Sequence, residues 1–202
     1  SVLFSAGADG TLTALSTISS AGQPAAQEDT TASETTAAPQ DIVISDQPYT
    51  HPTGFVSARL PEGWSVTEDE SLGISVQAVD ASGIIIIQAV NTFDEISGPQ
   101  FEKLVNNYDS SVKRSLGNSQ EMDRGFDDQA GEAFLTRKVV IAGLNYIHET
   151  YFNRVDNTVQ IVDFLSREEY AEQFLPHYQE IYARLQFDNG VILNQPVFNL
   201  TE

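Results

Sequence analysis

The sequence has no cysteine and only a small share of basic residues. Without cysteine the chain can form no disulfide, no thiolate metal site and no cysteine nucleophile. Ten Lys and Arg residues stand against 29 Asp and Glu residues, so the formal net charge is −19. Nucleic acids and anionic lipids are bound mainly through Lys and Arg, and this surface repels both. We therefore expect no nucleic-acid partner, whereas cations and basic proteins suit the charge.

Long apolar runs are also missing. The run from Ile84 to Ile87 is as long as any in the sequence, whereas a helix that spans a membrane needs about 20 apolar residues. We therefore expect no direct membrane insertion. The chain opens with Ser1 rather than Met. We interpret it as an exported protein (extracellular, on the cell surface or periplasmic) whose signal peptide has been removed. A truncated cytoplasmic protein is the alternative.

The common motifs for catalysis and cofactor binding are absent from the sequence. It has no G-x-S-x-G nucleophile elbow and no glycine-rich phosphate loop of either common type. The three histidines, His51, His148 and His177, lack the H-x-x-x-H spacing of a zinc site, so we expect surface or packing roles for them. Carboxylates are abundant, but abundance alone does not indicate acid–base chemistry. We expect no cofactor, no catalytic residue and no enzymatic activity.

One acidic loop is a candidate for a metal ion. Its carboxylates are Asp123, Asp127, Asp128 and Glu132, and two glycines lie among them. Hard cations such as Ca²⁺ prefer clustered carboxylates on flexible loops. The spacing does not match an EF-hand loop, because the required oxygens and the invariant glycine are missing. The sequence therefore allows only a weak calcium site here, with a solvated acidic turn as the alternative.

Charge and composition divide the chain into three parts. No basic residue precedes Arg59, and residues 19–40 are mostly Ala, Thr, Ser, Gln and Glu. Such a segment has too little apolar surface to offset the entropy lost on ordering, so it should be a linker. The predicted parts are an extended leader over residues 1–53, with a strand-prone piece at about 11–18 and the linker at 19–40, a domain over 54–188 and a C-terminal tail over 189–202.

The domain reads as an α+β fold. Four consecutive isoleucines, Ile84 to Ile87, would place two side chains on each face of a strand, so both faces of the sheet must be covered. Between Gln120 and Arg154 the pattern indicates antiparallel strands joined by tight turns. We predict an antiparallel sheet with helices packed on both faces.

Two amphipathic stretches supply those helices. Apolar residues recur at helical spacing from Phe101 to Leu116, after a capping box at Ser97. A second stripe runs from Tyr170 to Leu185, and we predict that its helix begins at Ser166. Pro176 lies inside this second stripe and should kink the helix or divide it in two.

The start of the domain carries a short motif, Gly54-Phe55 followed by Leu60-Pro61 and Trp64. With the hairpin, helix, strand meander and closing helix that follow, this motif resembles the PsbP-like family, which includes the photosystem II extrinsic subunit and exported bacterial relatives. The resemblance covers the whole predicted domain. It implies an α/β/α sandwich and a non-catalytic role in binding or stabilising another protein. The matching residues are typical fold determinants, so no functional residue carries over.

Two functions fit these observations. In the first, an exported accessory domain binds a protein partner and the leader is a tether. In the alternative, the chain is a subunit of an extracellular filament, and the strand-prone piece of its leader adds to the sheet of a neighbouring copy. The tail, with Val191 to Leu193 and then Val197 and Phe198, is a second strand candidate for such exchange. The expected partner contacts are Leu12, Ala14, Ser16, Ile18, Ile42 and Ile44.

Overall fold

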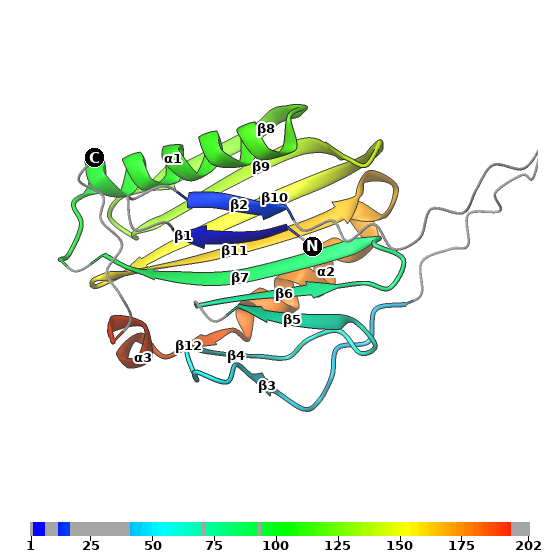
Figure 1. Ribbon diagram of the computed structural model, residues 1–202, viewed down its shortest axis with the longest axis horizontal. Helices are drawn as coiled ribbons and strands as arrows, with labels where there is room; N and C mark the ends of the chain where they lie inside the picture. The colour runs from blue at the N-terminus through cyan, green and yellow to red at the C-terminus, as the bar shows by residue number, and fades with distance from the viewer. Residues whose placement is uncertain (1, 7–11, 17–40, 70–71, 93, 195–202) are drawn as a thin grey trace, which may run out of the picture.

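The centre of the molecule is a seven-stranded antiparallel sheet (Figure 1). The computed structural model describes residues 2–6, 12–16, 41–69, 72–92 and 94–194. Neighbouring strands follow the order β5-β6-β7-β11-β10-β9-β8, and each adjacent pair is antiparallel. The strands are β5 (Ser65–Asp69), β6 (Gly73–Gln77), β7 (Gly83–Asn91), β8 (Ser119–Asp127), β9 (Glu132–Ile141), β10 (Leu144–Val155) and β11 (Thr158–Arg167). The predicted antiparallel sheet is confirmed.

Two helices pack on opposite faces of this sheet. In Figure 1, α1 (Gly98–Leu116) lies in front of the sheet and α2 (Ala171–Ala183) lies behind it. Of the four consecutive isoleucines of β7, Ile84 and Ile86 lie in the core under α1 and the other two in the core under α2. Successive side chains of a strand point to opposite faces, so both faces are buried. The predicted sandwich, with a helix on each face, is confirmed.

The first helix begins as the sequence predicts. The backbone N–H of Ser97 donates to Oε1 of Gln100 at 2.8 Å, which is half of a capping box. Pro99 lies in the first turn, where its missing N–H has no helical partner to lose. The helix ends at Gly117, whose φ of 71° is strained for other residues. Local sequence and the buried stripe therefore agree on this helix.

The second helix begins later than predicted. Ser166 belongs to β11, where it pairs with Gly83 of β7 and Ile147 of β10. Pairing on both sides and burial of this strand outweigh the capping pattern. A 3₁₀ turn, η1 (Glu168–Tyr170), then leads into α2, which continues through Pro176 as one helix and is not divided. No helix in the described part of the chain is long and apolar enough to cross a membrane.

Short elements close the end of the core under α2. A three-stranded sheet runs in the order β12-β4-β3, with Ile44 bridged to Pro61 beside it. The tail begins as a helix, and its Ile192 is fully buried in the core under α2, so residues 191–193 do not form the predicted strand. Val197 and Phe198 lie outside the described residues. The bounds are β3 (Tyr49–Thr50), β4 (Val56–Ala58), β12 (Gln186–Phe187) and α3 (Asn189–Leu193).

The leader contributes a hairpin that lies beside α1 on the same face of the sheet (Figure 1). Its strands β1 (Val2–Ala6) and β2 (Leu12–Ser16) pair antiparallel along their whole length. β2 contacts α1, and β1 contacts β6. The strand-prone piece predicted over residues 11–18 thus contains β2, but β2 pairs within its own chain. The predicted linker, residues 19–40, lies outside the described residues.

Candidate functional site

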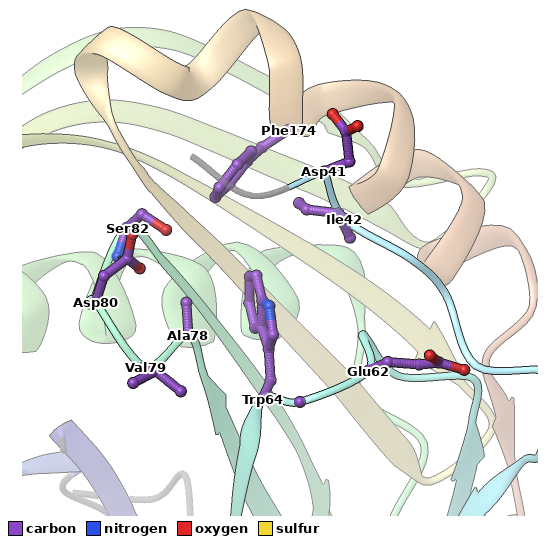
Figure 2. Close-up of a pocket in the computed structure, with 10 residues that line it drawn as sticks. Asp41, Ile42, Glu62, Trp64, Ala78, Val79, Asp80, Ser82 and Phe174 are labelled. Atoms are coloured by element: carbon purple, nitrogen blue, oxygen red, sulfur yellow. The ribbon is translucent and has the colours of Figure 1, made fainter. Parts of the chain in front are cut away.

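A hollow of about 520 Å³, here called the Trp64 pocket, opens beside α2 at the end of β6 (Figure 2). It is built from segments that are far apart in the sequence, so it exists only once the domain has folded. In Figure 2 the indole of Trp64 points from the start of β5 toward Phe174 of α2. The lining residues are Asp41, Ile42, Glu62, Gly63, Trp64, Ala78, Val79, Asp80, Ser82 and Phe174.

The aromatic wall of this pocket depends on a glycine. The ring centroids of Trp64 and Phe174 are 6.2 Å apart. A Cβ atom on Gly83 would lie 2.4 Å from the Trp64 ring, and 2.7 Å from both the Phe174 ring and the Tyr178 hydroxyl. These contacts are too close for any side chain, so glycine lets the first residue of β7 pass directly under the rings.

Acidic side chains edge the Trp64 pocket. Asp41, Glu62 and Asp80 line it, and its lining contains no Lys or Arg. Partial burial opposes ionisation of Asp80, but hydrogen bonds from Ser82 and the charge of Arg167 outweigh burial and lower the pKa of this carboxyl. Asp80 is therefore ionised at neutral pH, and the pocket combines two aromatic rings with negative charge.

A second hollow, here called the Tyr182 pocket, lies on the other flank of α2, over β10 and β11. Its volume is about 220 Å³. It adjoins a hollow of about 390 Å³ near the β8–β9 turn, with which it shares Tyr151 and Tyr182. The lining residues are Glu149, Tyr151, Phe164, Leu175, Tyr178, Gln179 and Tyr182.

Four of these residues form one aromatic cluster. The centroids of Tyr151 and Tyr182 are 5.0 Å apart, and Phe164 and Tyr178 stack at 4.6 Å. The Tyr178 hydroxyl donates to the carbonyl oxygen of Leu165 at 2.8 Å, which fixes its ring. α2 supplies its share because Leu175, Tyr178 and Tyr182 recur at helical spacing on the flank that faces the strands.

Glu149 places a carboxylate against these rings. Burial raises its pKa, since the charged form loses water on this half-buried strand. Burial first, and then the charges of Glu149 and Tyr182, raise the pKa of Tyr151 to about 12. Among the described residues Glu149 forms no salt bridge. The pocket thus holds a desolvated negative charge without a counter-ion.

The opposite face of the sheet carries a polar stripe that is closed to solvent. His148 Nε2 and Asp163 Oδ1 are 2.7 Å apart, and the Tyr108 hydroxyl donates to Asp163 Oδ2 at 2.5 Å. Thr150 donates to the same carboxylate at 2.8 Å. Arg137 pairs with Asp109 of α1 at 3.2 Å. The stripe crosses β9, β10 and β11 under α1.

The sequence pattern did not predict this stripe, and only a surface or packing role was expected for His148. A signal was present in the sequence, because Arg137 and Asp163 each have apolar residues two positions away on either side, on the inward side of their strands. A His–Asp pair at this distance is a familiar acid–base unit. His148 and Asp163 are, however, 1% and 0% exposed beneath α1, so no substrate reaches them in this conformation. The pair joins β10 to β11 beneath α1.

The predicted partner contacts fall into two groups. Leu12, Ala14 and Ser16 lie in β2, while Ile18 lies outside the described residues. Ile42 is 8% exposed in the core under α2, and Ile44 packs against the same core. These two isoleucines serve this chain's own core instead of projecting from it.

The predicted metal ligands are not brought together. Asp123 Oδ1 accepts from the N–H of Arg124, and Asp127 Oδ1 accepts from two N–H groups of the following turn. Asp128 pairs with Arg154 at 3.2 Å, and Glu132 lies at the start of β9. Within the described ranges no group of three or more His, Asp and Glu side chains is arranged to hold a metal ion. The turn's own backbone and Arg154 use the carboxylates instead.

Neither a family model nor a curated protein sequence matches the chain. Solved structures do share its fold. The Ran-binding protein Mog1p of Saccharomyces cerevisiae aligns with a TM-score of 0.52 at 9% identity, over 74% of this chain and 99% of that one. The PsbP protein (CyanoP) of Synechocystis sp. PCC 6803 aligns with a TM-score of 0.51 at 9% identity, over 75% and 98%.

A protein from Bacteroides thetaiotaomicron VPI-5482 aligns at 15% identity with a TM-score of 0.44, over 70% of this chain and 48% of that chain, so this chain spans about half its length. At these identities the likeness concerns the fold alone. That fold is the one shared by PsbP and Mog1p, as the resemblance in the opening motif implied. Membership in the family stays a prediction.

Proposed function

We propose that this chain is a non-catalytic, exported protein-binding domain of the PsbP-like type, whose Trp64 pocket receives a basic segment of a protein partner. The observation that carries the proposal is the lining of the pocket, where the described residues supply three carboxylates and two aromatic rings but no Lys or Arg. A neighbour in fold, Mog1p, is named for binding another protein, which supports a binding role.

Physical chemistry favours a basic partner over other kinds. A net charge of −19 steers cationic molecules toward the surface. Within the pocket, a guanidinium group can pair with a carboxylate and stack on an indole ring at the same time. Ordinary apolar contact with Phe174 would add to this. Electrostatics would thus govern the rate of association, and the rings would retain the partner.

The chain contains one tryptophan, so tryptophan emission, excited where tyrosine does not absorb, reports on this pocket alone. Short oligo-arginine and oligo-glutamate peptides are titrated against the full chain while Trp64 emission is followed. We expect oligo-arginine to change the emission with saturation and oligo-glutamate to leave it unchanged. The response should weaken as salt is added, because exposed charges are screened. An equal response to both peptides would contradict the proposal.

Matched variants test whether the pocket carboxylates are responsible. Glu62→Gln with Asp80→Asn should weaken oligo-arginine binding by about fivefold, as expected for two exposed ion pairs. Asn at position 80 can still accept from the N–H of Ser82, which keeps the turn. The control, Glu95→Gln with Glu102→Gln, makes the same change of charge at exposed positions on the side of α1. If both double variants weaken binding equally, the attraction belongs to the net charge and not to the pocket.

The alternative function, strand addition to a neighbouring copy, meets a competing contact. β2 is paired with β1 from Leu12 to Ser16, and the hairpin lies over this chain's own sheet. Deletion of residues 1–40 separates the two functions. We expect a soluble, folded monomer that still binds oligo-arginine. Loss of a large native assembly on deletion, seen by light scattering, would instead establish the filament.

A further inference from the structure

The Tyr182 pocket has the chemistry of a receptor for a small organic cation. We propose that it binds a quaternary or alkylated ammonium group of about the size of the choline head. This goes beyond the docking of a protein at the Trp64 pocket, because it concerns another flank of α2, other residues and a small ligand.

The accessible part of the aromatic cluster is a wall of two tyrosines. Tyr151 and Tyr182 pack against each other with centroids 5.0 Å apart and ring planes inclined at 38°, while Phe164 and Tyr178 are buried behind them. A ligand in the pocket would therefore lie against the tyrosine wall. A cation near ring faces is attracted by the negative charge above and below the ring, most strongly where water is excluded.

The carboxylate of Glu149 supplies the full charge that such a cation needs. It lines the same pocket as Tyr151 and Tyr182, and no salt bridge within the described residues neutralises it. Glu149 loses part of its hydration on burial. An ammonium group in the pocket would compensate for this loss by pairing with the carboxylate. Burial raises the pKa of Glu149, so its charged form is poorly solvated in the free protein.

Size and access agree with a small ligand. A volume of about 220 Å³ is below the range of about 300–1,000 Å³ of pockets for drug-sized molecules, so one compact group suits it. Tyr182 and Leu175 are 37% and 36% exposed, and these side chains form the mouth of the pocket. Gln179 adds a neutral polar group that can bond a hydroxyl or an amide on the ligand.

The test compares choline with its neutral carbon isostere, dimethylbutanol, by isothermal titration calorimetry on the full chain. The two molecules have nearly the same shape, so they differ mainly in charge. We expect choline to bind at least about tenfold more tightly, the ratio expected for a cation held by rings and one carboxylate. Equal affinity, or no binding of choline at millimolar concentration, would overturn the proposal.

Two variants locate the site. Glu149→Gln and Tyr182→Leu should each weaken choline binding by about tenfold. Glu172→Gln, which removes one charge from the exposed first turn of α2, should leave it unchanged. Thermal unfolding of each variant confirms that it is folded. If Glu172→Gln weakens binding as much as Glu149→Gln does, the cation is held by the general charge and the proposed site is wrong.

The outcome is independent of the proposed protein docking. Trp64 emission reports oligo-arginine at the Trp64 pocket, whereas calorimetry with choline reports the Tyr182 pocket. If Tyr182→Leu abolishes choline binding and leaves the Trp64 response intact, the two sites are distinct. Oligo-arginine that competes with choline would show that the Tyr182 pocket holds a peptide side chain, and it would overturn the assignment to a small ligand.

Discussion

The two faces of the sheet use carboxylates in opposite ways. Under α1, Asp163 and Asp109 are buried and each is bound by several donors. Beside α2, Asp80 and Glu149 line open pockets, and Glu149 has no counter-ion in the described part of the chain. The polar groups under α1 therefore bond to one another inside the core, whereas the carboxylates beside α2 line pockets that are open to solvent.

This difference separates stability from binding. A buried polar network ties the elements that contribute to it into one packing arrangement, and removal of one charged member leaves its partner as an uncompensated buried charge. A carboxylate left desolvated at a surface pocket weakens the free protein slightly, which is common at functional sites. The contrast predicts that changes under α1 reduce stability, and that changes beside α2 alter binding.

The largest effect should follow the loss of Asp163. Asp163→Ala removes the buried carboxylate that His148, Tyr108 and Thr150 share as a hydrogen-bond partner. The free energy of unfolding should fall by about 3–5 kcal/mol, measured by denaturant titration. Asp80→Ala on the other face should cost less than about 1 kcal/mol. Similar losses for both variants would remove the contrast between the faces.

A smaller loss is expected at Gly83, which lies beneath the aromatic wall of the Trp64 pocket. Gly83→Ala places a Cβ atom 2.4 Å from the Trp64 ring, so the rings of Trp64 and Phe174 must shift. Overpacking of this kind costs about 1–3 kcal/mol. The emission maximum of Trp64 should also move, because its ring is displaced toward solvent. Unchanged stability and emission would mean that the rings are not held as the structure shows.

His148 should contribute to the pH dependence of the free energy of unfolding. Burial lowers the pKa of this histidine, against the opposing effect of Asp163 on β11, with Arg137 of β9 and Tyr108 and Asp109 of α1 around it. The folded state therefore binds the imidazole proton less readily than the unfolded chain does. Stability should fall as pH drops below about 6.5, by at most about 1.4 kcal/mol per pH unit.

His148→Gln isolates this contribution. Asp and Glu residues titrate in both proteins, so the difference between their pH profiles belongs to the histidine. We expect a shallower loss of stability between about pH 7 and 5 in the variant, whatever its stability at neutral pH. Denaturant titrations at a series of pH values measure both slopes. Parallel profiles would show that burial does not depress the protonation of His148.

Much of the fold could be predicted from local pattern. The isoleucines of β7 required cover on both faces, and α1 carried its stripe and its cap together. The start of the second helix could not be predicted in this way. Ser166 and Glu169 imitate a capping box, but strand pairing with Gly83 and Ile147 keeps Ser166 in β11. Such pairing joins distant segments, so no local window contains it.

The candidate sites were less accessible to sequence reasoning. Trp64 was identified as part of a fold motif, and its place in an open pocket follows only from loops that meet α2 in space. Glu149 was not predicted as a site residue, because nothing in the sequence distinguishes it from the other acidic residues, 29 in all. Its role depends on its position beside Tyr151 and Tyr182 in the folded chain. Pockets are formed by residues far apart in the sequence, whereas the core residues of a strand can be predicted from its local pattern of apolar and polar residues.

The smallest effect should be a gain in stability at Glu149. Burial raises its pKa, so the folded state holds the proton more tightly than the unfolded chain, and stability is lost as pH rises through the folded pKa. Glu149→Gln removes that loss and should stabilise the free protein at neutral pH by up to about 0.5 kcal/mol. Denaturant titration at pH 7 and near pH 4 measures the gain, which should vanish at the lower pH.

Choline affinity should fall in the same variant. A variant that lost both stability and affinity would show that Glu149 supports the fold, and the division of labour between the two faces would not hold at this position.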